Sequence, residues 1–198
     1  MAGGTWIETI LHSFNYGQGG FPEGGPVLDA HGRLYGTTYE GGLYGDGVVY
    51  RLAPPTSSGG TWTYRALHSF TGHLDGGYPR GSLVVHGVGV LYGTTSGGGA
   101  YGGGGTVFQL VPPAAVGAAW TENVLCNFGS ATADAGEPTA NILFDSAGNI
   151  YGTTLAGGDM NAGAVFELTP PSSSGGDWTE TVLHSFGEIK MARRLLGA

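Results

Sequence analysis

One nine-residue pattern recurs along the chain and constrains its fold more than any other feature. The pattern is Trp-x-x-x-x-Leu-x-x-Phe, found at 6–14, 62–70, 120–128 and 178–186, so successive tryptophans are 56, 58 and 58 residues apart. Two further blocks recur in between: Tyr-Gly-Thr-Thr, and an apolar run that is followed by a Pro-Pro pair. Repetition at a fixed period indicates an architecture in which each unit buries its apolar faces against its neighbours.

Each unit is expected to contain four short strands. Turn sequences beginning at Asp29 and Asp145 predict a tight hairpin before Tyr-Gly-Thr-Thr in the first and third units. The Pro-Pro pairs end the third strand, because proline cannot continue a hydrogen-bonded ladder. Gly 41 and Pro 10 fit tight turns, and 40% hydrophobic residues argue against a disordered chain.

Four strands at a period just above 50 residues are typical of a propeller blade. We therefore predict an all-β fold of β-propeller-type four-stranded blades, with three repeats and one extra outer strand at 6–14. A β-sandwich-like packing is the alternative. The expected organisation is one repeat domain at 6–186, with units at about 6–61, 62–119 and 120–177 and a closing strand at 178–186. The tail at 187–198 abandons the repeat and is expected to be disordered or a short helix.

Composition excludes several classes of function. The net charge is −8 and no basic stripe is present, so nucleic-acid binding is not expected. The single cysteine, Cys126, excludes an internal disulfide and a cysteine-cluster zinc site. No stretch is apolar over the ~18 residues that a membrane span needs. The chain begins without a signal-peptide pattern, and no cofactor is expected.

The combined motifs resemble the GloVer-type tandem repeats of large bacterial extracellular, autotransporter-like proteins. The resemblance rests on Trp178-Thr-Glu-Thr-Val-Leu-His-Ser-Phe186, on Asp-x-x-Gly-Asn-x-Tyr-Gly-Thr-Thr and on Gly-x-Val-Phe-x-Leu-x-Pro-Pro, and it covers 6–186. It implies propeller-like folding and an extracellular or cell-surface location, with any leader outside this sequence. It implies no chemistry, because the repeat marks a scaffold.

Function is expected in the loops that differ between units. In a propeller, the loops at 15–25, 71–81 and 129–140 share one rim with those at 39–46, 96–105 and 155–163. Tyrosines among glycines there offer flat apolar faces that suit sugars or a protein surface, although the same residues also form turns. The predicted ligand-binding residues are Tyr16, Tyr39, Tyr44, His73, Asp75, Tyr78, Arg80 and Tyr101.

Two classes of function stay open at this stage. The first is a binding or scaffold module for a glycan or protein ligand. The second is a glycoside hydrolase or lyase, which needs two carboxyl groups roughly 5–10 Å apart. The candidate catalytic carboxylates are Glu40, Asp46, Asp75, Asp134 and Asp159. His12, His68 and His184 share a column with Cys126, and we interpret them as packing residues, so no metal site is expected.

Assembly follows from counting units. Closed propellers usually have four to eight blades, and three units are too few to close a ring. A homodimer that completes a six-bladed ring is one solution, although 6–14 and 178–186 would then compete for one place. A monomeric arc, a sandwich-like packing or another oligomer are the alternatives.

Overall fold

The computed structural model describes residues 5–115, 117–131, 134–173 and 175–187. The described residues form thirteen strands and no helix, which confirms the all-β prediction. The strands form three antiparallel sheets, and none of these sheets closes into a barrel. With no helix in this part of the chain, no helical membrane span is found there. Residues 188–198 of the tail predicted at 187–198 lie outside the described residues.

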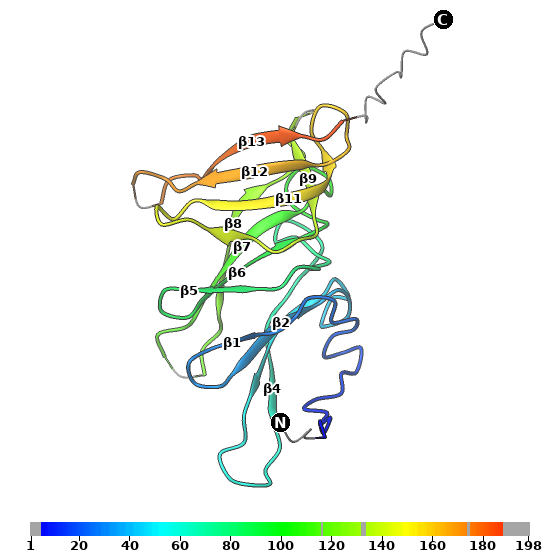
Figure 1. The fold of residues 1–198 in the computed structure, drawn as a ribbon, viewed down its shortest axis with the longest axis vertical. Coiled ribbons are helices and arrows are strands. Elements are labelled where there is room, and N and C mark those ends of the chain that lie inside the picture. Colours follow the sequence, from blue (N-terminus) through cyan, green and yellow to red (C-terminus); the bar gives the residue numbers. More distant parts are fainter. Residues whose placement is uncertain (1–4, 116, 132–133, 174, 188–198) are drawn as a thin grey trace, which may run out of the picture.

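Each sheet is a meander of strands that are consecutive in the sequence, and the three sheets follow one another along the long axis (Figure 1). The first sheet contains β1 (Val27–Leu28), β2 (Leu34–Thr38), β3 (Val48–Ala53) and β4 (Thr63–Ser69). The second contains β5 (Val84–His86), β6 (Val90–Thr95), β7 (Thr106–Val111) and β8 (Thr121–Asn127). The third contains β10 (Leu143–Phe144), β11 (Ile150–Gly157), β12 (Ala164–Thr169) and β13 (Thr179–Ser185), with β9 (Ala135–Pro138) added beside β11.

The glycine of Tyr-Gly-Thr-Thr is required by the strand that pairs with it. Gly152 lies opposite Phe166, and a Cβ at Gly152 would lie 2.5 Å from the Phe166 ring. A Cβ at Gly93 would approach the Phe108 ring in the same way, at 2.7 Å. The missing side chain therefore allows an aromatic ring to lie across the middle strand, which explains why glycine recurs there in every unit.

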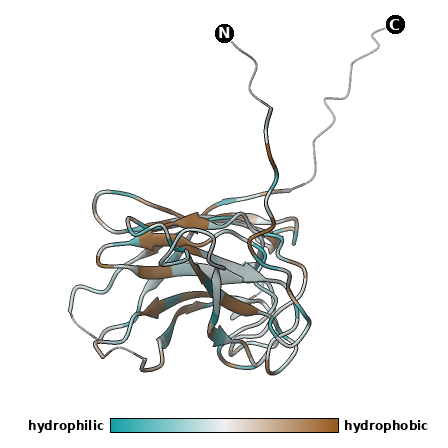
Figure 2. Cartoon of the chain, turned by 90° about the horizontal axis from the view of Figure 1, so that it is seen from below, coloured by the Kyte–Doolittle hydropathy of each residue, from teal (hydrophilic) through white to brown (hydrophobic). Residues whose placement is uncertain are grey.

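The core lies between the sheets, and phenylalanines connect one sheet to the next. Phe70, after β4, packs on Phe108 of the second sheet with ring centroids 5.2 Å apart. Phe128, after β8, packs on Phe166 of the third sheet at 5.0 Å. All four rings are fully buried. Figure 2 shows the hydrophobic colour gathered on the strands, with paler loops around them.

The outer strand predicted at 6–14 does not form. Residues 5–15 have no strand structure, because no described strand lies beside them to supply hydrogen-bond partners. The end of this segment nevertheless packs as its equivalents do, since Phe14 contacts Tyr50 of β3 with ring centroids 4.9 Å apart. Its beginning is uncovered, and Trp6 is 98% exposed.

The junction phenylalanines predict unequal costs for one substitution. We expect Phe128→Ala to lower the free energy of unfolding by about 3–5 kcal/mol, because it empties a fully buried site between two sheets. Phe186→Ala, at the equivalent position after β13, is expected to cost less than about 1 kcal/mol, because Phe186 is 45% exposed. Urea denaturation of dilute protein measures both values. Equal costs at the two positions would contradict the junction as described.

Candidate functional site

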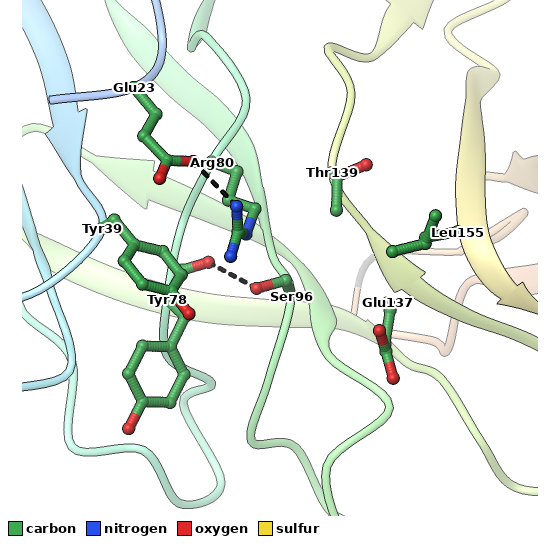
Figure 3. A pocket seen from close by; sticks show the side chains of 8 residues that line it. All are labelled: Glu23, Tyr39, Tyr78, Arg80, Ser96, Glu137, Thr139 and Leu155. Carbon is green, nitrogen blue, oxygen red and sulfur yellow. Dashed lines mark hydrogen bonds and ion pairs between the residues drawn. The ribbon is translucent and has the colours of Figure 1, made fainter. Parts of the chain in front are cut away.

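A pocket of about 610 Å³ opens where loops of all three units converge (Figure 3). We call it the central pocket. Its lining residues are Glu23, Tyr39, Tyr78, Arg80, Ser96, Glu137, Thr139 and Leu155.

The lining residues occupy equivalent positions in the repeat. Glu23, Arg80 and Thr139 each follow the loop proline, and Tyr39, Ser96 and Leu155 each follow Tyr-Gly-Thr-Thr. The residue before the proline has a positive φ in every unit: 54° at Phe21, 59° at Tyr78 and 54° at Glu137. One backbone conformation is therefore repeated three times, and it presents a different set of side chains from each unit.

Backbone pairing holds these loops in place. Gly20 bridges to Glu40 in the first unit, Gly77 bridges to Gly97 in the second, and β9 pairs with β11 in the third. The second threonine of each Tyr-Gly-Thr-Thr block also caps the loop that follows it. Thr38 Oγ1, for example, donates to the carbonyl oxygen of Glu40 at 3.0 Å. The frame of the pocket thus depends on residues that all units share.

A charged and aromatic cluster forms one wall of the central pocket. Arg80 Nη1 donates to Glu23 Oε2 at 3.0 Å, and the Arg80 guanidinium lies 4.2 Å from the centroid of the Tyr39 ring. The Tyr39 and Tyr78 rings are 5.3 Å apart, and Ser96 Oγ donates to the Tyr78 carbonyl oxygen at 2.8 Å. The ion pair is partly exposed, so both charged groups remain accessible to a ligand.

The Tyr78 hydroxyl remains a hydrogen-bond donor at neutral pH. The Asp46 carboxylate, through hydrogen bonding and its charge, raises the pKa of Tyr78 above the usual value. The backbone supports this arrangement, since the Tyr78 amide donates to the Asp46 carbonyl oxygen at 2.8 Å. Asp46 thus influences Tyr78, a residue of the pocket wall, although Asp46 itself does not line the pocket.

The structure separates the predicted ligand-binding residues into several places. Tyr39, Tyr78 and Arg80 meet in the central pocket. The Tyr16 hydroxyl group donates a hydrogen bond to Glu40 Oε2 at 3.3 Å. The others lie elsewhere on the surface: Tyr44 and Asp75 in a hollow beside Trp120, His73 in a glycine-lined hollow, and Tyr101 on an exposed turn.

None of the five candidate catalytic carboxylates lines the central pocket. Asp75 Oδ2 binds His68 Nε2 at 3.2 Å and the Thr71 amide at 3.0 Å, so it holds its own loop. Asp134 does the same with Ser130. Asp159 is exposed, and Glu40 and Asp46 have the local roles described above. The carboxylates that do line the central pocket are Glu23 and Glu137, which the prediction omitted.

A second titratable cluster lies at each junction between sheets. Burial, with the charge of Asp75, raises the pKa of Glu122 to about 7. Burial and hydrogen bonding to Asp134 raise the pKa of Glu180 to about 8. Burial also raises the pKa of the Cys126 thiol, which lies 3.5 Å from Glu180, and this favours the interpretation of Cys126 as a packing residue. No group of three or more potential metal ligands gathers within the described ranges.

Comparison with protein families gives one result for the whole chain. A family model described as the Gloeobacter/Verrucomicrobia repeat matches residues 1–196. No curated protein matches the chain.

The two partly buried glutamates, Glu122 and Glu180, predict that the free energy of unfolding falls as pH rises. Their raised pKa values mean that the folded chain binds more protons than the unfolded chain between about pH 5 and 8, so the free energy of unfolding decreases across that range. Burial lowers the pKa of His68, which has the opposite effect, but only near and below its ordinary value of about 6.5.

The measurement is therefore made from pH 7 to 8.5, where His68 is neutral. We expect the urea midpoint of the wild type to fall over this range, and that of the Glu122→Gln/Glu180→Gln variant to change much less. Glu8→Gln is the matched control, because Glu8 occupies the same column but is exposed. A pH dependence that survives in the double variant would contradict the assignment.

Proposed function

The chain belongs to the Gloeobacter/Verrucomicrobia repeat family, and we propose that it is a binding module whose central pocket takes a glycan. The observation that carries the proposal is the difference between the backbone of the pocket loops and the side chains that line the central pocket. The loop frame repeats in all three units, whereas the side chains that line the central pocket differ from unit to unit. A pure scaffold needs only the frame, so the varied lining supports a ligand-binding role.

The chemistry of the lining suits a polyhydroxylated ligand. Tyr39 and Tyr78 supply flat apolar faces, on which the C–H face of a sugar ring packs. Arg80 supplies donors, and the carboxylates of Glu23 and Glu137 supply acceptors for hydroxyl groups. A volume of about 610 Å³ lies within the range of small-ligand pockets, which is roughly 300–1,000 Å³. A concave site of this size favours a short glycan over a flat protein surface.

Binding has more support than catalysis. A glycosidase needs two carboxyl groups that are free to act on the glycosidic bond. The Glu23 carboxylate is already held by Arg80, since Arg80 Nη1 lies 3.0 Å from Glu23 Oε2. The five carboxylates predicted for an enzyme lie outside the central pocket. An extracellular or cell-surface location completes the proposal, and its support is the resemblance of the motifs to exported repeat proteins.

The test begins with a glycan array and continues by calorimetry with the best-bound glycan. We expect Tyr39→Ala to weaken binding by about tenfold or more, because it removes the ring that Arg80 covers and that lies 5.3 Å from the Tyr78 ring. Arg80→Ala should weaken binding similarly. Tyr101→Ala is the matched control, since Tyr101 is exposed on the same rim but outside the central pocket.

Two results would overturn the proposal. One is an array on which the wild type binds no glycan. The other is a set of affinities in which Tyr39→Ala and Tyr101→Ala have the same effect. The melting temperature of each variant should stay within a few degrees of the wild type, which separates lost binding from lost structure.

A further inference from the structure

The third sheet exposes a face that the first two sheets bury. We call this the open face, and it comprises Leu143, Tyr151, Thr153, Val165, Leu183 and Phe186. Val49 and Val107, the equivalents of Val165, are fully buried, whereas Val165 is partly exposed. Leu183 and Leu143 are 50% and 70% exposed. The open face is therefore a junction surface without a neighbouring sheet among the described residues.

Within the described part of the chain, the same surface also lacks a polar contact that both inner junctions make. We call the two contacts between neighbouring sheets of the chain the inner junctions. Thr37 Oγ1 donates to the carbonyl oxygen of Gly81, which leads into the second sheet, at 3.2 Å. Thr94 Oγ1 donates to the carbonyl oxygen of Ala140, which leads into the third sheet, at 3.4 Å. Thr37 and Thr94 are buried, but Thr153, their equivalent, is exposed. The open face thus presents both the apolar side chains and the hydroxyl group that each inner junction uses.

The chain also carries the complementary surface, at its other end. The first sheet turns Leu34, Tyr50, Leu52 and Trp62 away from the second sheet, and we call these the entry face. In the second sheet the equivalent residues pack against the first sheet, and Leu91, Phe108 and Leu110 are fully buried. Among the described residues, the segment that covers the entry face of the first sheet is the one that contains Leu11 and Phe14.

The segment that covers the entry face has the same sequence as the end of the third sheet. Residues 11–14 read Leu-His-Ser-Phe, and residues 183–186 read the same. Phe14 packs on Tyr50 as Phe70 packs on Phe108, so the cover uses the normal junction contact. Residues 183–186 of another molecule would therefore make the same contacts on the entry face that residues 11–14 make.

We propose that the open face binds the entry face of a second copy of this chain, head to tail, and that residues 183–186 of one copy replace residues 11–14 of the other. Thr153 then donates to the carbonyl oxygen of Gly24 of the partner subunit, since Gly24 is the equivalent of Gly81 and Ala140. Tyr151 meets Trp62 of the partner subunit, as Tyr35 meets Trp120 at 6.2 Å within the chain. Two copies about a two-fold axis give two identical junctions and a closed set of six sheets.

The entry face suits this occupant in charge as well as in shape. In the inner junctions, burial and a facing aspartate together raise the pKa values of Glu122 and Glu180. The entry face has Tyr64 at this position, and Tyr64 stacks on His12 with ring centroids 4.8 Å apart. His184 replaces His12 on the same ring, so the exchange buries no acidic pair.

The exchange preserves the packing on the entry face and adds new burial. Leu183 and Phe186 take the places that Leu11 and Phe14 vacate, and Leu143, Val165 and the remainder of the entry face become covered as well. Burial of apolar surface is the usual driving force of association. Two faces that already fit as neighbours within the chain therefore pair between chains.

The experiment measures the mass of the full chain by light scattering at roughly 50 μM. The wild type is expected at 40.2 kDa, twice its 20.1 kDa monomer mass. Leu183→Glu on the open face and Trp62→Ser on the entry face should each give 20.1 kDa, with Leu34→Ser as a second entry-face variant if Trp62→Ser melts early. Leu43→Glu is the control, because Leu43 is 75% exposed on a loop outside both faces, and it should stay at 40.2 kDa.

Mixing the two variants tests the head-to-tail geometry. Leu183→Glu chains keep an intact entry face, and Trp62→Ser chains keep an intact open face, so the mixture should recover a species of 40.2 kDa through one junction. A mixture that stays at 20.1 kDa would overturn the proposal, because an intact open face and an intact entry face would then have failed to bind each other. A monomeric wild type, a dimeric Leu183→Glu variant or open polymers of the wild type would overturn it too.

Discussion

Every feature of this chain depends on the junction at which one four-stranded sheet packs face to face with the next. A small open sheet has two apolar faces and no core of its own, so only a neighbour can bury them. The aromatic contacts at the junctions, Phe70 on Phe108 and Phe128 on Phe166, place a ring from the end of one sheet on the middle of the next. Stability is therefore expected to accumulate junction by junction, as in other repeat proteins.

The same junction creates the central pocket. Successive loops approach so closely beside its lining residues that side chains are excluded there, since a Cβ at Gly24 or at Gly81 would lie 2.7 Å from a backbone oxygen of the following loop. This close approach fixes the spacing of the units, and the residue just before each of these glycines, Glu23 or Arg80, lines the pocket. A pocket with one wall from each unit follows from packing alone, and only its side chains remain free to set its chemistry.

The sequence was informative where the repeat itself carried the physical signal. The strands around Tyr-Gly-Thr-Thr and before Pro-Pro were predictable, because turn and proline chemistry act locally. Strand pairing is not local. The strand expected at 6–14 does not form, because no described strand lies beside this segment to pair with it. In the pocket, Tyr39, Tyr78 and Arg80 were predicted from composition, whereas Glu23 and Thr139 were missed. Alignment of the units on the loop proline would have found both, because each occupies the position of Arg80.

We call the contact between residues 11–14 and the entry face the first junction. It has Tyr64 at the column where the two junctions between sheets have Glu122 and Glu180. Burial raises the pKa of Tyr64 to about 12, so Tyr64 remains uncharged at any physiological pH. Glu122 and Glu180 at the same column lose their protons near pH 7 and 8, so the inner junctions acquire adjacent negative charges in alkaline solution. The inner junctions tolerate this cost because their phenylalanines are fully buried. The first junction has only the half-buried Phe14. With a neutral tyrosine at this column, the first junction does not bear the destabilising free energy of two adjacent carboxylates.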